Sequence, residues 1–315
     1  VEGYCVEYLS RYLLFTVPIL LMNNFTLYMI ASEKAALSLV CSVTGGVLNM
    51  VLDFVFIAGF GMGISGAAVA TGLGYSVTAV AGLIVFSRKK SLLHFKKPVM
   101  RFKVLAGAAT NGCSEMATAL VTGIITMMFN WTMLRYVGED GVAAVTIIMY
   151  VLMFASSLYT GYSYGVAPML SYYYGEQNHE KLKKLVAVSL KVIAVISVMT
   201  VVMSFALTKP LVSVFARPDN PVHGLAVTGN RICTIALFFI GFNIFASGMF
   251  TALSNGVVSA VLAFSRSFVF MLVTMLVLPL ILGVNGIWLA TPAAELMALL
   301  LSAGMFLKYR KRYGY

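Results

Sequence analysis

Charged residues are scarce in this chain. Only 10% of its 315 residues are Asp, Glu, Lys or Arg, whereas 60% are hydrophobic, and a typical soluble domain carries roughly 25% charged residues. With so few charges the chain cannot cover its surface with polar groups, so lipid must solvate much of it. The composition therefore predicts an all-α, polytopic membrane protein.

Cysteines and catalytic motifs are also few. The four cysteines are scattered through apolar runs without a CxxC pair, so neither a disulfide framework nor a zinc site is indicated. No Walker A, HExxH or GxSxG motif occurs, and no nucleophile–base pair or metal cluster shares one depth, so we expect no enzyme and no cofactor. Gly61, Gly63 and Gly66 match a dinucleotide fingerprint but lack a βαβ unit, which predicts a tight turn.

Apolar stretches long enough to cross a bilayer recur along the whole chain. A spanning helix needs about 20 apolar residues, and short loops with Gly, Pro, Asn and charge separate the stretches. We predict about nine spans, at residues 8–31, 36–60, 64–87, 104–136, 142–174, 185–207, 226–250, 267–283 and 285–307.

The basic residues predict an orientation. Nine spans place alternate loops on opposite sides, which puts 17 of the 22 Lys and Arg on one side and 5 on the other. The positive side faces the cytoplasm, so we expect residues 88–103 and the C-terminus there, and the net charge of +11 needs no nucleic-acid partner. This assignment places Arg266 in a loop and leaves no Lys or Arg in mid-span.

A weak internal repeat relates the two ends of the chain. Residues 64–73 and 284–293 share a Gly, an Ala and a Thr at an offset of 220, and Arg11 and Arg231 share the same offset. Six predicted spans separate the copies, so the repeats run parallel. Only three spans precede the basic loop and six follow it, so we expect that the chain, which begins with Val1, is a fragment lacking about three spans.

Three of the eleven acidic residues lie within predicted spans, namely Asp53, Glu115 and Glu295. A charge in the bilayer interior costs several kcal/mol, so such residues are functional candidates. The alternative is a protonated acid that forms a hydrogen bond between packed helices.

Asp53 has polar neighbours that favour a cation or proton site. Gly45, Asn49 and Asp53 lie four residues apart and form one helical stripe. The preceding span carries Asn23 and Asn24 after Pro18, which kinks the helix and frees a carbonyl group. Amide, carboxylate and carbonyl oxygens are hard ligands for a small cation, and a buried carboxylate alternatively binds a proton because burial raises its pKa.

Glu115 lies on a longer polar stripe that predicts a wet cavity or a helix contact. At 1.5 Å per residue the stripe spans about 28 Å, nearly the whole hydrocarbon core. Its members recur every three or four residues and are Asn111, Glu115, Thr118, Thr122, Thr126 and Asn130.

Two segments resemble a known transporter family. GGVLNMVLDFVFIAGFGMGISGAAVAT is similar to the fifth and sixth helices of the multidrug and toxic compound extrusion (MATE) transporters. NGCSEMATALVTGIITMMFNWTMLRYVGEDGVAA, followed by SYGVAPMLSYYYGEQN, is similar to their seventh and eighth helices, with detail that resembles the MepA-like bacterial branch. The resemblance covers essentially the whole chain.

The resemblance implies a fold, an activity and an environment. MATE transporters have twelve spans in two six-helix lobes, so this chain would be helices four to twelve, with part of the first lobe in residues 1–95 and the second lobe in 96–315. Family members export cationic, amphipathic compounds in exchange for Na⁺ or H⁺. We accordingly expect a monomer in the bacterial inner (plasma) membrane whose partners are cationic drugs or metabolites and the lipid bilayer.

The resemblance also implies site residues. Asn49, Asp53, Asn23 or Asn24, and Thr71 match four components of the family's first-lobe cation site, the only metal site we expect. Glu115 matches an acid on helix seven, and with it we group Asn111, Thr118, Thr122 and Glu295 as candidates for substrate binding or proton coupling. The acid that some branches carry on helix ten has no counterpart, and Asn243 is the nearest polar residue.

Two other interpretations remain open. A lipid-linked oligosaccharide flippase of the same superfamily should carry cationic residues in its cavity to bind phosphates, and the absence of a mid-span Lys or Arg disfavours it. An inactive fragment is the second alternative.

Overall fold

The computed structural model describes residues 2–89, 91–97 and 99–315, apart from the side chains of residues 2, 103–104, 107–119 and 311. In this part of the chain all regular structure is helical and no strand occurs, which confirms the predicted all-α fold. The chain divides into two compact units, Val1–Arg101 and Phe102–Tyr315. From the sequence, we placed the division after residue 95.

The first unit contains four α-helices and one π-helical turn. A break of 59° separates the first two helices. Pro18 explains the break, because proline cannot donate a backbone hydrogen bond to the carbonyl group of Leu14 and its ring collides with that group. The elements are α1 (Glu2–Leu13), α2 (Thr16–Ala31), α3 (Ala35–Asp53), η1 (Phe54–Gly59) and α4 (Gly63–Ser87).

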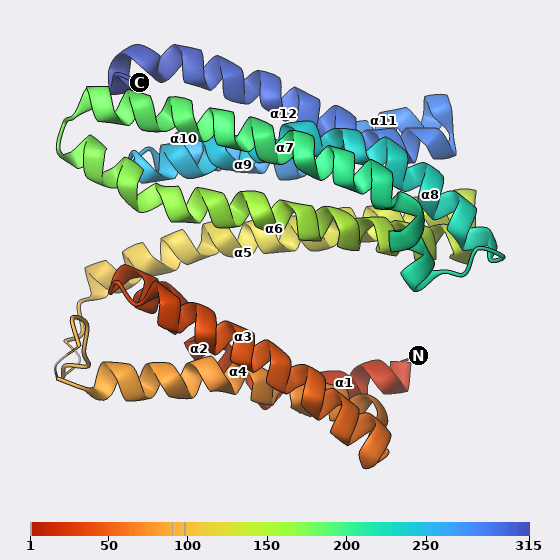
Figure 1. Ribbon diagram of the computed structural model, residues 1–315, viewed down its shortest axis with the longest axis horizontal. Coiled ribbons are helices and arrows are strands. Elements are labelled where there is room, and N and C mark those ends of the chain that lie inside the picture. The colour runs from red at the N-terminus through yellow and green to blue at the C-terminus, as the bar shows by residue number, and fades with distance from the viewer. Residues whose placement is uncertain (1, 90, 98) are drawn as a thin grey trace. The chain divides into compact units, whose positions relative to one another are not determined.

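Helices α2 and α4 lie side by side in this unit (Figure 1). A Cβ atom added to Gly82 would lie 2.1 Å from the Phe25 ring, so only glycine leaves room for the ring there. Phe25, Met29 and Phe86 are buried together. This packing holds α2 on α4, and the turn before α4 has positive φ angles at Gly61 and Gly63, as the tight-turn interpretation predicted.

The second unit is built from longer helices. Two of them, α6 and α7, have 37 residues each, which at 1.5 Å per residue gives about 55 Å, longer than a bilayer's hydrocarbon core. The elements are α5 (Phe102–Tyr136), α6 (Glu139–Gly175), α7 (His179–Phe215), α8 (Pro221–Cys233), η2 (Thr234–Ala236), α9 (Leu237–Ala252), α10 (Gly256–Phe264), η3 (Ser265–Phe270), α11 (Met271–Leu282) and α12 (Val284–Tyr313).

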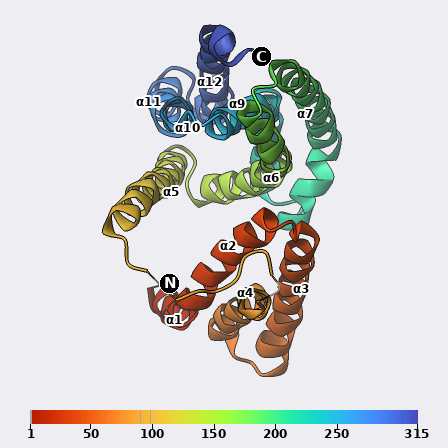
Figure 2. The ribbon, with the colours of Figure 1, turned by 90° about the vertical axis from the view of Figure 1, so that its left-hand side faces the viewer.

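Helix α9 lies at the centre of the second unit, in contact with α6, α7, α10 and α12 (Figure 2). Buried side chains on α9 include Phe245, Met249 and Phe250. The hydroxyl group of Tyr159 on α6 donates a hydrogen bond to the Leu237 carbonyl oxygen (2.9 Å) and lies 2.6 Å from the Thr200 hydroxyl. These bonds join α6, α7 and α9 in the core.

The helices correspond to the predicted spans with one correction. Seven described helices are long and apolar enough to cross a membrane, and the bent pair α1–α2 makes an eighth. Helix α5 covers the predicted span 104–136. The span predicted at 267–283 instead runs from Gly256 to Leu282. Arg266 therefore lies inside a span, and its assignment to a loop was wrong.

The internal repeat extends to the helix boundaries. Helices α1, α2, α3 and α4 begin at positions that, after adding 220, fall within one residue of the beginnings of α8, α9, α10 and α12. Gly63 and Gly283, which differ by 220, have φ angles of 56° and 58° where α4 and α12 begin. The two ends of the chain therefore repeat the same three-span pattern, whose first span is broken between two helices.

Candidate functional site

A cavity of about 180 Å³ opens among α2, α3 and α4 of the first unit. It includes Asn49 and Thr71, two of the residues predicted to bind a cation. Its lining consists of Met22, Ser42, Gly45, Gly46, Asn49, Thr71, Gly74, Tyr75 and Thr78.

Two glycines bring the walls of this cavity together. A Cβ atom on Gly45 would lie 2.6 Å from the Gly74 carbonyl oxygen, and a Cβ atom on Gly74 would lie 2.8 Å from the Gly45 carbonyl oxygen. Without side chains at this crossing the backbones of α3 and α4 approach closely. One turn after Gly45, Asn49 Nδ2 then reaches Thr71 Oγ1 at 3.4 Å.

Asp53 lies one further turn along α3, where the helix changes to the π-helical turn η1. Its Oδ1 atom is buried, and no described residue donates a hydrogen bond to it. An ionised oxygen in this state is costly, because it has lost its hydration without gaining a donor or a cation. The structure therefore leaves a ligand position open at this oxygen, and the ion-binding role of Asp53 stays a prediction.

Asp53 and the other two predicted cation ligands, Asn23 and Asn24, lie outside the cavity lining. Asn23 and Asn24 are exposed on α2, and their side-chain amides donate to the carbonyl oxygens of Ile19 and Leu20, four residues earlier (3.1 and 2.8 Å). The structure thus brings Asn49 and Thr71 together, with Asp53 one helical turn after Asn49, but does not bring Asn23 or Asn24 to them.

The polar stripe predicted around Glu115 lies on the continuous helix α5. The side chains of Asn111, Glu115 and Thr118 lie outside the described residues. Thr122 is exposed, and its carbonyl oxygen accepts a hydrogen bond from the hydroxyl of Thr126 (2.9 Å). The candidate role of Glu115 therefore remains a prediction.

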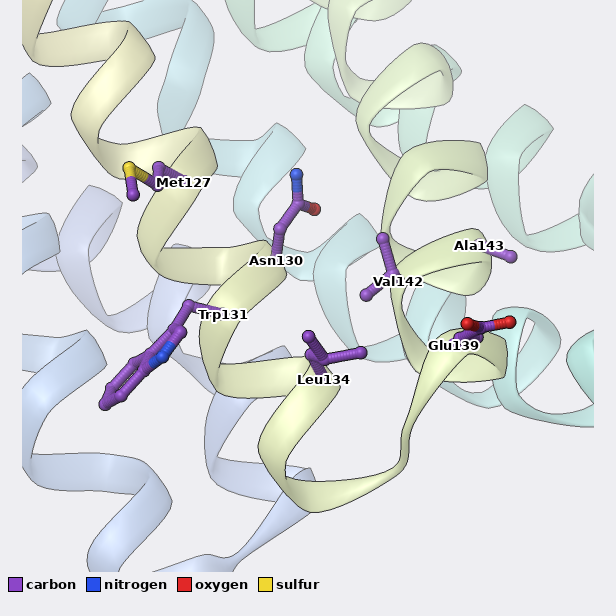
Figure 3. Close-up of a pocket in the computed structure, with 7 residues that line it drawn as sticks. All are labelled: Met127, Asn130, Trp131, Leu134, Glu139, Val142 and Ala143. Atoms are coloured by element: carbon purple, nitrogen blue, oxygen red, sulfur yellow. The ribbon is translucent and has the colours of Figure 1, made fainter. Parts of the chain in front are cut away.

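The far end of this stripe borders a cavity of about 510 Å³ between α5 and α6. Figure 3 shows Asn130, Leu134 and Val142 between the two helices, while the Glu139 carboxylate lies beyond Val142 on α6. The volume falls within the range of about 300–1,000 Å³ typical of small-molecule sites. Met127, Trp131 and Ala143 complete the lining.

A charged cluster joins three helices inside the second unit. Arg266 Nε donates to both carboxylate oxygens of Glu295 (2.8 and 2.9 Å). Asn243 Nδ2 donates to the same carboxylate (2.8 Å) and to the Glu295 carbonyl oxygen (2.9 Å). Ser302 Oγ in turn donates to Asn243 Oδ1 (3.1 Å), which fixes the orientation of the amide.

Sequence reasoning selected Asn243 and Glu295 but missed Arg266 and Ser302. The structure shows why: an isolated arginine between apolar runs marks a loop by hydropathy, whereas here it is neutralised by an acid 29 residues later. The signal available in the sequence was the unpaired mid-span acid Glu295, which needed a partner at the same depth.

Comparison with known proteins identifies the family. The MatE family model matches residues 116–280, just over half of the chain. The chain belongs to the MATE family. Multidrug export protein MepA of Staphylococcus saprophyticus is 23% identical over 254 residues, which cover 80% of this chain and 54% of that protein. Multidrug export protein MepA of Staphylococcus haemolyticus is 24% identical, covering 98% of this chain and 68% of that protein.

Solved MATE structures share the fold. An outward-facing multidrug resistance MATE family transporter of the MOP superfamily superposes with a TM-score of 0.86 at 23% identity, covering 98% of this chain and 69% of that one. A MOP superfamily transporter from Pyrococcus furiosus, described as having a binding pocket of reverse polarity that suggests a different function, gives a TM-score of 0.87 at 22% identity, with 98% and 69% coverage. This MATE chain spans about half of the S. saprophyticus relative's length.

Proposed function

We propose that this MATE chain takes part in the export of cationic, amphipathic organic compounds in exchange for Na⁺ or H⁺. The observation that carries the proposal is the buried Asp53 oxygen, to which no described residue donates a hydrogen bond, one helical turn after Asn49 in the cavity lining. A proton or a small cation removes the desolvation cost of that oxygen. Asp53 is therefore the proposed binding group for the coupling ion.

Substrate binding is proposed for the second unit. Glu115 on α5 would meet the positive charge of the compound, and the largely apolar cavity between α5 and α6 suits its hydrophobic part. The names of the staphylococcal relatives, multidrug export proteins, support this substrate class. Export would proceed by alternating access of the two units, with the C-terminus in the cytoplasm.

Arg266 reopens the alternative of anionic cargo, because the sequence argument against a flippase was the absence of a mid-span cation. In the structure Glu295 neutralises this arginine, so the pair as a whole carries no net charge that would attract a phosphate group. Cationic cargo therefore remains the proposal.

Ethidium export from bacterial cells that lack their own efflux pumps tests the function. Cells expressing the chain should retain less ethidium than cells with an empty vector, and Asp53→Asn or Glu115→Gln should abolish the difference. Asp219→Asn, at an exposed loop position, is the matched control and should export normally. Unchanged export by both Asp53→Asn and Glu115→Gln would show that the site assignment is wrong.

In proteoliposomes, imposing a Na⁺ gradient or a pH gradient separately identifies the coupling ion. Export should follow one gradient and not the other. Export that follows neither would contradict the antiport mechanism.

A further inference from the structure

The surrounding residues hold the two members of the Arg266–Glu295 pair unequally. The Glu295 side chain is 6% exposed and that of Arg266 is 24% exposed. Asn243 also fixes the carboxylate, and Ser302 fixes the amide of Asn243. Arg266 is bound through Nε alone, and no described residue accepts a hydrogen bond from its two terminal nitrogens. The carboxylate is thus the rigid member of the pair and the guanidinium is the movable one.

The backbone around Arg266 supports a movable side chain. Arg266 lies in the π-helical turn η3, Ser265–Phe270, which interrupts the span Gly256–Leu282. Such turns are rare and frequently accompany functional sites, because their i→i+5 bonds are less regular than those of an α-helix. Breaking the pair without a replacement would leave a buried carboxylate uncompensated, which is strongly unfavourable. The arginine can therefore leave only if another cation takes its place or a proton neutralises Glu295.

The internal repeat gives an independent indication that this is a binding position. Subtracting the repeat offset of 220 from 295 gives Tyr75, and subtracting it from 266 gives Gly46. Both residues line the cavity of the first unit. The pair therefore stands where the repeated helices of the first unit enclose a cavity, and in the second unit side chains occupy the equivalent place.

We propose that Arg266 is a tethered cation occupying a cation site formed by Glu295 and Asn243, and that a compact monovalent cation binds there by displacing it. The ligand is either Na⁺ or the amidinium, guanidinium or ammonium head of an organic substrate, since each matches the charge that the arginine supplies. Displacement conserves the charge of the site, so neither state leaves Glu295 unpaired. The proposal extends the proposed cation transport to a second site, and rests on it for a role in transport.

Direct binding measurements test the displacement. The purified chain carries Asp53→Asn, so that this carboxylate does not contribute. Binding of radiolabelled Na⁺ and, by calorimetry, of benzamidinium is measured at pH 8. A tethered competitor lowers apparent affinity by the fraction of time that the site is open, so Arg266→Gln should tighten binding of one probe by about tenfold or more. Adding Glu295→Gln should abolish that binding.

The tighter probe identifies the source of the ligand, an inorganic ion or an organic head group. Arg231→Gln, at an exposed arginine on α8, is the matched control and should leave both affinities unchanged. Unchanged or weaker binding of both probes in Arg266→Gln overturns the proposal. Ethidium export by the unmodified chain is measured in parallel. If that chain exports no ethidium but Arg266→Gln tightens cation binding, the proposed function alone is refuted. If that chain exports ethidium but Arg266→Gln leaves binding unchanged, the displacement alone is refuted.

Chemical modification provides a second measurement that needs no substitution at the pair. Displaced Arg266 becomes accessible to phenylglyoxal, and mass spectrometry reports its modification. Saturating Na⁺ or benzamidinium should increase the modification of Arg266 while leaving that of Arg231 unchanged. Equal modification of Arg266 with and without both cations also overturns the proposal.

Discussion

Replacing Gly45 by alanine should separate α3 from α4 and open the first-unit cavity. The added Cβ atom would lie 2.6 Å from the Gly74 carbonyl oxygen, whereas ordinary contact begins at 3.4 Å. The backbones must therefore absorb the difference of about 0.8 Å, and overpacking of this kind costs about 1–3 kcal/mol. Asn49 Nδ2 and Thr71 Oγ1 are already 3.4 Å apart, so the same shift breaks their hydrogen bond.

Gly46→Ala is the matched control on the adjacent residue. Nothing lies within 4 Å of a Cβ atom at Gly46, and alanine in a helix interior is favoured over glycine by about 0.5–1 kcal/mol. Thermal unfolding in detergent, followed by size-exclusion chromatography, should show Gly45→Ala melting below the unmodified chain and Gly46→Ala melting at or above it. Equal melting temperatures for the two variants would refute the close crossing of α3 and α4.

Three further substitutions probe other parts of the structure. Tyr159→Phe removes the hydroxyl that joins three helices and leaves the Leu237 carbonyl without that donor. The free energy of unfolding should fall by about 1–3 kcal/mol, as measured by thermal unfolding. No change would mean that water replaces the bond. Pro18→Ala restores a backbone donor and should reduce the 59° break, seen as a longer spin-label distance between the ends of α1 and α2; an unchanged distance would assign the break to packing. Asn243→Ala removes one donor from the Glu295 carboxylate and should lower stability by about 1–3 kcal/mol, and a melting temperature equal to that of the unmodified chain would contradict this.

Most of the fold could be predicted from patterns that are local in the sequence. Runs of about 20 apolar residues located the helices, because lipid requires every backbone group to be paired within its own helix. The proline rule located the kink near Pro18. Helix length was less predictable: the span predicted at 185–207 is part of α7, which runs from His179 to Phe215. Lys181, Lys183 and Lys184 were predicted to lie in a loop but belong to α7.

The limits of prediction are clearest at the two polar sites. Asn49 and Asp53 follow one another on a single helix, so periodicity alone placed them together. The pairing of Thr71 with Asn49 came from family resemblance, and its structural cause, the crossing at Gly45 and Gly74, depends on contacts between two helices. Arg266 was assigned wrongly because its partner Glu295 lies on another helix, and hydropathy sums charge along the chain without regard to pairing in space.

The contrast between Asp53 and Glu295 leads to a final prediction about how ion binding is coupled to export. No described residue donates a hydrogen bond to the buried Asp53 oxygen, so emptying its site would leave the carboxylate uncompensated, whereas Glu295 keeps Arg266 as a counter-charge. Antiport requires that the carrier does not change its conformation while its ion site is empty. We expect the free-energy cost of the uncompensated Asp53 carboxylate to prevent that change. Asp53→Asn removes the cost, so we expect ethidium to equilibrate across proteoliposomes without any ion gradient but not to accumulate against its own gradient. Glu295→Gln should leave accumulation dependent on the ion gradient. Equilibration by Asp53→Asn that still requires the coupling ion would show that the coupling resides elsewhere in the chain.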